Sequence, residues 1–427
     1  MIRKFLISVC FAFACFSANA QDTISLMHYN LLNYGNDYEG CTQNSNNIDT
    51  KATHLSLIFS TCKPDVLTVN ELACNASVAQ HLLDNALNVD GESDYRLADL
   101  TCQSTPYLSN TLYYNLRKVR FHSSEVITTT VRDINIFKMY YYSNDLLAGD
   151  TAFFHCVVAH LKAGSDAADK TQRATETAAL MSELSQNDYE NVILLGDFNV
   201  RASTETSFQN LINDSDPGLR FYDPINQLGS WNSNASFAGI HTQSTHNTSG
   251  CAAGGGMDDR FDFILISKEV KDGTTNFIYV PDSYEAIGQD GQHFNKALTD
   301  SPENSMVSSS LVNALYGASD HLPVRLKLRV NKTLAIDDLS SSLAFNLNMA
   351  SYFRNEIRFR LEGISGLSNA NIRLYDILGN QVLNLENQEI FIGEDITFNT
   401  SHLNSGIYIL VITDKQLGSL SKKLVKF

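Results

Sequence analysis

The chain has 427 residues, and 43% of them are hydrophobic, which is enough for two or more packed domains. It carries 31 basic and 47 acidic side chains, for a formal net charge of −16. This balance excludes the capture of nucleic acid by a broad basic surface, although bound cations can still attract a polyanion locally.

Residues 1–20 have the pattern of a secretory signal peptide. Arg3 and Lys4 precede an apolar run over residues 5–16, and Ala18-Asn19-Ala20 supplies an A-x-A cleavage site. The run is too short to span a membrane, and no later segment predicts a span. We therefore expect an exported protein without a transmembrane segment, with a net charge of −18 after cleavage (29 basic and 47 acidic residues).

The cysteine count favours disulfides in such an exported chain. Six cysteines remain after the expected cleavage: Cys41, Cys62, Cys74, Cys102, Cys156 and Cys251. Their pairing does not follow from the sequence. No C-x-x-C pair occurs, which argues against a zinc ribbon.

Residues 21–330 mix predicted strands and helices. Alternating, aromatic and β-branched runs predict strands at residues 23–32, 66–72, 111–115, 134–142, 151–161, 191–199, 259–267 and 323–330. Apolar residues at helical spacing predict helices over residues 50–62 and 169–184. The polar segment 268–318 has weak periodicity, and we expect long surface loops there.

From about residue 331 the pattern changes to short strands separated by Gly and Asn turns. Ile357, Phe359 and Leu361, for example, alternate with Arg358 and Arg360. We expect a linker over residues 331–344 and a small all-β sandwich over residues 345–427. A carbohydrate-binding module is one reading of such a sandwich, but this one has no Trp and few candidate aromatic platforms.

This C-terminal segment resembles the sorting domain of type IX secretion substrates. The resemblance rests on Leu374-Tyr375-Asp376, Leu378-Gly379, Ser405-Gly406-Ile407-Tyr408 and the basic end Lys422-Lys423-Leu424-Val425-Lys426-Phe427. It implies that the type IX machinery carries the protein across the outer membrane to the cell surface or medium. The tail is expected to be removed during this passage.

Polar residues stand near the ends of the strands predicted within residues 21–330. They are Asn30, Glu71, His160, Asp197, Asn199, Asp262, Asp320 and His321. Residues two apart on a strand share a face, so Asp197 and Asn199 in "GDFN" are expected to point the same way. Each residue taken alone also has a structural interpretation as a turn, a cap or a buried histidine.

The order of these residues resembles that of the endonuclease/exonuclease/phosphatase family, which has the deoxyribonuclease-I-like fold. The motifs are "HYNLL", "NEL", "AHLKAG", "GDFN", "DRFDFIL" and "SDHLPV", spread over residues 23–330. The resemblance implies a catalytic domain over residues 21–330 with an α/β fold. Its architecture would be a four-layer α/β sandwich, in which two mixed sheets pack face to face with helices outside.

The same resemblance implies a divalent metal site. Glu71 would be the main metal carboxylate, with Asn30 and Asp320 beside it. Hard divalent cations prefer oxygen ligands, so Mg²⁺ is the expected ion, with Mn²⁺ or Ca²⁺ as alternatives.

Five residues would carry the chemistry of the resemblance. Asp197 would orient or deprotonate an attacking water, and Asn199 would hold a phosphate oxygen or a metal-bound water. His160 and His321 would donate to the phosphoryl oxygens where charge develops. Asp262 would bind the other nitrogen of His321 and fix its tautomer.

Three positions are less well matched to the family pattern. Arg132 stands where an arginine often contacts the substrate phosphate, although a surface arginine explains it equally well. The acidic partner of the first histidine is missing, because Leu108-Ser109-Asn110 occupies its place. The tyrosine that contacts phosphate has three candidates: Tyr107, Tyr113 and Tyr114.

Together these features predict a secreted, monomeric, metal-dependent phosphodiesterase, with extracellular DNA or RNA as the expected substrate. One alternative is a hydrolase of phospholipid or sugar-phosphate head groups, of the sphingomyelinase or inositol-phosphatase type. Another is a catalytically silent binding protein at the cell surface.

Overall fold

The computed structural model describes two stretches of the chain. They are residues 22–332 except 39, 105–106, 145 and 147–150, and residues 345–427 except 351, 364–366, 378–379, 392 and 415–417. The expected signal peptide, the expected linker beyond residue 332 and the Leu378-Gly379 pair lie outside the described residues. The chain divides into two compact units between residues 334 and 335. We call them the first unit and the C-terminal unit; the domain limits expected from the sequence stay a prediction.

The first unit contains two mixed β-sheets. One has the strand order β10-β12-β1-β2-β4-β3, with β11 paired to β12, and the other has the order β5-β6-β7-β8-β9. The first sheet comprises β1 (Thr23–Tyr34), β2 (Val66–Ala73), β3 (Tyr95–Leu97), β4 (Leu108–Asn115), β10 (Phe277–Tyr279), β11 (Glu285–Ala286) and β12 (Val324–Val330). The second comprises β5 (Val119–Ile127), β6 (Ile134–Tyr141), β7 (Phe153–His160), β8 (Val192–Asp197) and β9 (Asp262–Ile266).

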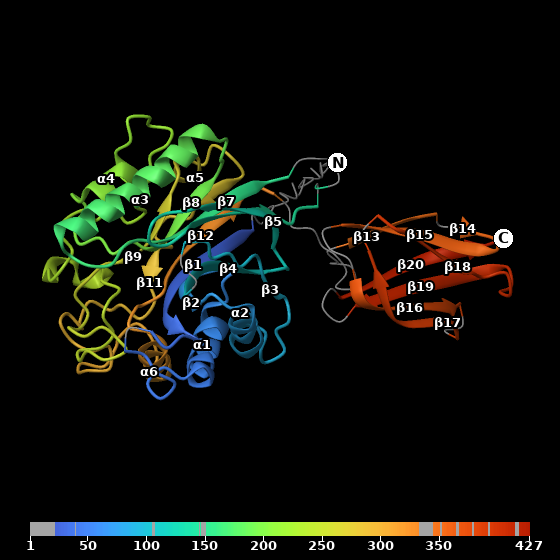
Figure 1. Ribbon diagram of the computed structural model, residues 1–427, viewed down its shortest axis with the longest axis horizontal. Coiled ribbons are helices and arrows are strands. Elements are labelled where there is room, and N and C mark those ends of the chain that lie inside the picture. Colours follow the sequence, from blue (N-terminus) through green and yellow to red (C-terminus); the bar gives the residue numbers. More distant parts are fainter. Residues whose placement is uncertain are drawn as a thin grey trace, which may run out of the picture. The chain divides into compact units, whose positions relative to one another are not determined.

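Helices cover both outer faces of the paired sheets (Figure 1). They are α1 (Ile48–Cys62), α2 (Ala76–Leu82) with the π-helix η1 (Leu83–Leu87), α3 (Ala167–Gln186), α4 (Thr206–Ile212), the 3₁₀ helix η3 (Ala235–Ile240), α5 (Lys268–Asp272) and α6 (Ser309–Ala318). Asn47 caps the start of α1 by accepting from the Thr50 N–H. Lys63 ends that helix in the left-handed conformation, just before Pro64.

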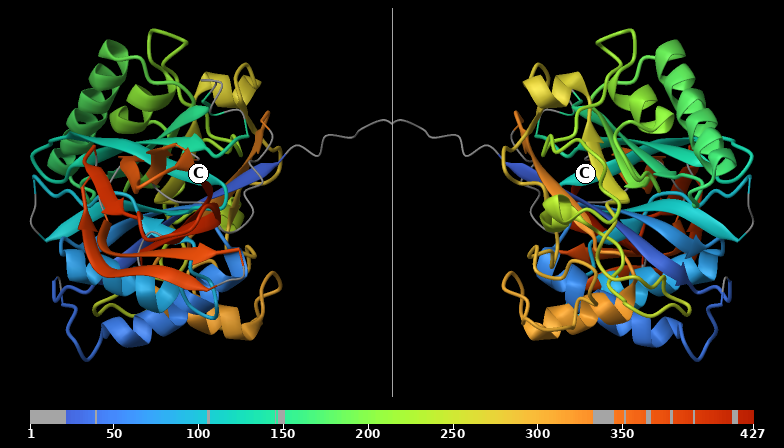
Figure 2. Two further views of the ribbon diagram at one scale, coloured as in Figure 1. Left: turned by 90° about the vertical axis from the view of Figure 1, so that its right-hand side faces the viewer. Right: turned by 90° about the vertical axis from the view of Figure 1, so that its left-hand side faces the viewer.

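Three clusters of buried side chains hold these layers together. Leu26 and Leu326 of the first sheet share one cluster with Phe137 and Ile193 of the second, so the two sheets pack face to face. A second cluster joins α1, α2 and α6 to the outer face of the first sheet, and a third joins α3 and α4 to the second sheet. Figure 2 shows α1 and α3 on opposite outer sides of the sheets. The unit is therefore the four-layer α/β sandwich that the sequence predicted.

The prediction of long loops over residues 268–318 was wrong in part. This segment contains α5, β10, β11 and α6 in addition to loops. Leu311 and Leu315 of α6 pack into the cluster beside α1, so burial on a neighbouring helix stabilises a helix of only ten residues. None of the described helices has the length and apolar character needed to cross a membrane.

The C-terminal unit consists of two β-sheets. One contains β13 (Phe345–Met349), β15 (Glu356–Gly363) and β18 (Asp395–Asn399). The other contains β14 (Tyr352–Phe353), β20 (Gly418–Lys426), β19 (Gly406–Asp414), β16 (Leu367–Asp376) and β17 (Gln381–Ile390). Phe359 of the first sheet and Leu374 and Leu410 of the second lie in one buried cluster. The predicted all-β sandwich is confirmed for the described residues.

Candidate active site

The topology of the second sheet gathers polar residues at one edge. Strands β7 and β8 run parallel and both end there, while β9 is antiparallel to β8 and begins there. His160 at the end of β7 therefore lies opposite Asp197 at the end of β8, which lies opposite Asp262 at the start of β9.

The first sheet repeats this arrangement. Strands β1 and β2 are parallel, and Asn30 pairs with Asn70, next to Glu71. Strand β12 is antiparallel to β1, so Asp320 and His321, just before β12, come to the same edge. The two sheet edges meet, because the Asn30 Nδ2 of one sheet donates to the Asp197 Oδ2 of the other at 3.0 Å.

The "GDFN" stretch ends β8 in a tight turn. Gly196 is required there, since a Cβ at this position would lie 1.8 Å from the Ala159 carbonyl oxygen on β7. The Asn199 N–H donates to the Asp197 Oδ1 at 3.0 Å, and Asn199 itself has a φ of 52°. Such a left-handed residue is costly unless its surroundings hold it. Both residues line the same cavity, but Asn199 lies beyond the end of β8, so the turn and not strand alternation brings it there.

Asp197 lies between two imidazoles. Its Oδ2 is 3.6 Å from the His160 Nε2 and 3.7 Å from the His321 Nε2. Burial raises the pKa of Asp197 to about 7; the charges of Asp262 and Glu71 add to the shift, while His321 opposes it. A carboxylate with this pKa can accept a proton near neutral pH.

Glu71 is turned toward the cavity by an irregular backbone. It has a φ of 59°, and the pairing of β2 with β4 changes register between Val69 and Leu72. The Glu71 Oε2 accepts from the Asn33 N–H at 3.0 Å. The Glu71 Oε1 accepts from the Asn30 Nδ2 at 3.0 Å and lies 3.8 Å from the His160 Nε2.

Asn30 links the two carboxylates. Its Nδ2 donates to both Glu71 and Asp197, and its Oδ1 accepts from the Leu32 N–H at 3.0 Å. The amide nitrogen of Asn30, rather than its oxygen, thus faces the acidic groups in this structure. Its predicted role as a metal ligand stays a proposal.

His321 and Asp262 form a buried pair. The His321 Nδ1 and the Asp262 Oδ2 are 2.8 Å apart, and the Gln243 Nε2 lies 2.7 Å from the His321 Nε2. Burial alone would lower the pKa of His321, but the charges of Asp262 and Asp197 and the hydrogen bond to Asp262 outweigh it. They hold this pKa well above its ordinary value, which favours the charged form of the imidazole.

His160 has the opposite character. Its Nδ1 is buried and has no hydrogen-bond partner among the described residues. Asn110, in the place of the missing acidic partner, donates instead to the Asp133 carbonyl oxygen at 2.6 Å. Burial, with the nearby charges of Arg132 and His321, holds the pKa of His160 well below its ordinary value. His160 is therefore a neutral imidazole.

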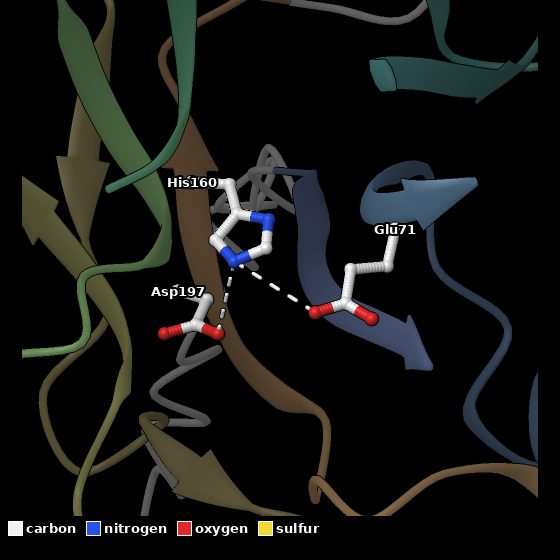
Figure 3. Close-up of side chains that lie close together, drawn as sticks. All are labelled: Glu71, His160 and Asp197. Carbon is white, nitrogen blue, oxygen red and sulfur yellow. Dashed lines mark ion pairs between the residues drawn. The ribbon is translucent and has the colours of Figure 1, made fainter. Parts of the chain in front are cut away.

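The donor set fits a hard cation. Glu71, His160 and Asp197 each offer one ligand atom, and these atoms lie within 4.8 Å of one another (Figure 3). Asp320 accepts from the Ala253 N–H through Oδ2 at 2.8 Å, but its buried Oδ1 has no partner among the described residues. Crowded carboxylates with an unpartnered oxygen are what a divalent cation would stabilise.

One cavity of about 400 Å³ joins these groups. Seven of the nine predicted residues line it: Glu71, Arg132, His160, Asp197, Asn199, Asp320 and His321. The other two, Asn30 and Asp262, bind members of this set directly. The Arg132 Nη1 donates to the Leu161 carbonyl oxygen at 3.0 Å, which fixes this side chain at the cavity. The structure thus brings all nine together; their roles stay predictions.

Sequence reasoning missed several residues of the site. Gln243, Arg201 and Asn33 also line the cavity, and the Asn70 Oδ1 accepts from the Asp197 N–H. Asn70 stands beside Glu71 in "NEL" and could have been found from that position, whereas Gln243 lies in a loop without a recognisable motif. Of the three tyrosine candidates, none lines the cavity as described.

Two disulfides are present among the described residues. They are Cys41–Cys251 and Cys74–Cys102, and Cys62 and Cys156 are buried free thiols. The expectation of disulfides is confirmed, and the structure supplies the pairing.

Comparisons with known proteins identify the C-terminal segment. Residues 354–426 match the family described as "Secretion system C-terminal sorting domain". No curated protein matches the chain.

The chain is similar to several solved structures, three of which follow. D. rerio TDP2, complexed with a single-strand DNA product, has 15% identity and a TM-score of 0.47, over 73% of this chain and 100% of that one. An endonuclease/exonuclease/phosphatase from Beutenbergia cavernae has 13% identity and a TM-score of 0.43, over 94% and 99%. The human Nocturnin catalytic domain, with bound sulfate, has 14% identity and a TM-score of 0.43, over 73% and 98%.

The matched residues include strands β15 to β20 of the C-terminal unit. Residues 354–426 are therefore similar to secretion system C-terminal sorting domains.

Proposed function

We propose that the first unit is a divalent-metal-dependent hydrolase of phosphate esters, and that the whole chain is an exported nuclease. The observation that carries this proposal is the convergence on one cavity of eight residues from motifs spread over residues 23–330, together with Arg132. Acidic, amide and imidazole groups within a few ångströms of one another are the geometric requirement for such chemistry.

The ligands of the cation would be Glu71 and Asp320, joined by Asn30 when its amide turns so that Oδ1, which accepts from the Leu32 N–H, faces the cation. Glu71 and Asp320 each accept from a backbone N–H through one oxygen; the other Glu71 oxygen accepts from the Asn30 Nδ2, and the other Asp320 oxygen has no hydrogen-bond partner among the described residues. When bound, Mg²⁺ would neutralise phosphate charge and polarise the phosphorus–oxygen bond. Without such a cation, the carboxylates of the cavity would repel an anionic substrate.

Asp197 is the proposed base. With a pKa of about 7 and two asparagine donors holding it, it can take a proton from a water that attacks phosphorus. As the water oxygen bonds to phosphorus, the bond to the leaving oxygen breaks in line. Asn199, beside the base, would hold a phosphate oxygen.

His321 and Arg132 supply fixed positive charge opposite the base. The cationic His321 would donate from Nε2 to a phosphoryl oxygen, once the substrate replaces its contact with Gln243. Asp262 keeps the imidazole oriented and charged. His160, being neutral, can donate only in the tautomer that carries its proton on Nε2.

The sorting domain supports the proposed route of export. We propose that the type IX machinery recognises residues 345–427 and delivers the first unit to the cell surface or the medium. A nuclease there would act on extracellular DNA or RNA.

A substrate panel tests the proposal. Purified protein is incubated with plasmid DNA, RNA, sphingomyelin and inositol phosphates, each with Mg²⁺, Mn²⁺, Ca²⁺ or EDTA. We expect cleavage of nucleic acid with Mg²⁺ and none with EDTA. Hydrolysis of a head-group substrate alone would replace the nuclease with the alternative activity, and no hydrolysis of any substrate would favour a binding protein.

A further inference from the structure

A disulfide joins a loop that lines the cavity to the loop that follows β1. Cys41 follows β1 and Cys251 precedes β9, 210 positions later in the chain. Cys251 and its neighbours Ser249, Gly250, Ala252 and Ala253 line the cavity.

On one side, this disulfide contacts the residue that holds Glu71. The Asn33 N–H is the donor to the Glu71 Oε2, and the Asn33 Nδ2 lies 3.5 Å from the Cys41 Sγ. Asn33 is buried and has a φ of 52°, so its surroundings must maintain its conformation. Cys41 is one of those surroundings.

On the other side, Cys251 lies two residues before Ala253, whose N–H group binds Asp320. The Ala253 N–H donates to the Asp320 Oδ2 at 2.8 Å. None of residues 247–255 is buried, and this stretch contains three glycines and two alanines. Apolar packing therefore contributes little to its position, and the disulfide is its covalent anchor.

We propose that Cys41 and Cys251 are positioning residues of the metal site. Their disulfide keeps the Asn33 and Ala253 N–H groups in place, and these two donors aim Glu71 and Asp320 at one cation. Metal binding, and with it hydrolysis, then requires the oxidised enzyme. This inference rests on the proposed function.

The proposal implies that the enzyme is inactive while this disulfide is reduced, before export. A dithiol reductant breaks the sulfur–sulfur bond and supplies two electrons and two protons, so that two thiols form and the reductant becomes a disulfide. In a reducing compartment the loop would lack its anchor, and the site would bind metal weakly. A disulfide oxidant in an oxidising compartment would take two electrons and two protons from the two thiols, and would thereby complete the site.

The second disulfide provides a matched control. Neither Cys74 nor Cys102 lines the cavity. The Cys74 N–H donates to the Tyr107 carbonyl oxygen, and neither cysteine is bonded to Asn33 or Ala253. Its loss should affect stability without disturbing the donors to Glu71 and Asp320.

The test compares C41A/C251A with C74A/C102A in the full chain. Mn²⁺ affinity is measured by electron paramagnetic resonance, and folding is checked by circular dichroism. We expect Mn²⁺ affinity to fall about 10-fold or more in C41A/C251A, as for other groups that orient metal ligands, and to stay at the wild-type value in C74A/C102A. Wild-type affinity in C41A/C251A, or equal losses in both variants, would overturn the proposal.

A reversible measurement covers the case in which C41A/C251A does not fold. In the C74A/C102A background, Cys41–Cys251 is the disulfide that remains among the described residues. Reduction should weaken Mn²⁺ binding and speed amide exchange over residues 247–255, and reoxidation should restore both. Affinity that does not change on reduction would contradict the proposal. If the wild type neither binds Mn²⁺ nor hydrolyses any phosphate ester, both the proposed function and the role of this disulfide are wrong.

Discussion

The two units of the chain bury polar groups very differently. Among the described residues of the C-terminal unit, the buried polar side chains are Thr400, Asp414 and Lys426. The Lys426 Nζ binds the Thr400 carbonyl oxygen. Strand β15, for example, alternates buried Ile357 and Phe359 with exposed Arg358 and Arg360.

The first unit instead crowds ionisable groups together at one sheet edge. Asp197, Asp262, Asp320, His160 and His321 are all buried there, and both Glu71 and Asn199 have left-handed backbones. Burying charges without compensation is costly, so an arrangement of this kind indicates function rather than stability. The comparison teaches that buried charge and irregular backbone occur together at this edge, as expected of a functional site.

The largest expected effect comes from replacing one carboxylate in the first unit, compared with one carboxylate in the C-terminal unit. In the first unit, Glu71→Gln should lower kcat about 10³-fold, because a metal carboxylate is worth several kcal/mol. Glu386→Gln, on the exposed strand β17 of the C-terminal unit, should leave kcat unchanged. Initial rates on DNA with Mg²⁺ measure both, and equal rates for E71Q and the wild type would refute the assignment of Glu71.

A second contrast concerns hydrogen-bonded aspartates. Asp262→Asn should lower kcat about 10²-fold with little change in KM, since His321 loses the group that orients and charges it. Asp395 on β18 is the exposed hydrogen-bond partner of Arg360 on β15. Asp395→Asn should not affect kcat. A KM effect of D262N without a kcat effect would assign Asp262 to substrate binding instead.

Arg132 should show a smaller effect, on binding rather than on rate. Arg132→Met should raise KM about 10-fold and leave kcat close to the wild-type value, because a charge-assisted contact with phosphate is lost. The KM should also become less sensitive to salt. An unchanged KM would identify Arg132 as a structural residue that only binds the Leu161 carbonyl oxygen.

The smallest expected effect on hydrolysis comes from the C-terminal core. Leu410→Ala should lower the free energy of unfolding of the C-terminal unit by about 2–5 kcal/mol, since Leu410 is fully buried. The hydrolysis rate should not change. Calorimetry and initial rates measure the two quantities, and a parallel loss of activity would show that the units are coupled.

Much of the fold follows from the sequence, because its signals are local. Alternation over β1 and β12 and the apolar run of β8 identified these strands, and the spacing of Leu180 and Leu184 identified α3. Helix α6 was missed because its stability comes from burial beside α1, which is a long-range contact. Short strands such as β3 and β11 leave too few residues for a pattern.

The site was predictable only where a side chain belongs to a motif. All eight motif residues lie together, yet the donors that orient Glu71 and Asp320 are the backbone N–H groups of Asn33 and Ala253. A backbone donor leaves no trace in residue identity, and neither does the pairing of Cys41 with Cys251. The charge of His160 depends on burial and on a missing partner, which only the three-dimensional arrangement reveals.

The central claim is that the carboxylates of Glu71 and Asp320 bind one divalent cation. Anomalous diffraction from crystals soaked in Mn²⁺ tests it most directly. We predict one strong peak within ligand distance of both Glu71 and Asp320. A crystal without any peak at that cavity, from a protein whose hydrolysis survives EDTA, would contradict the account.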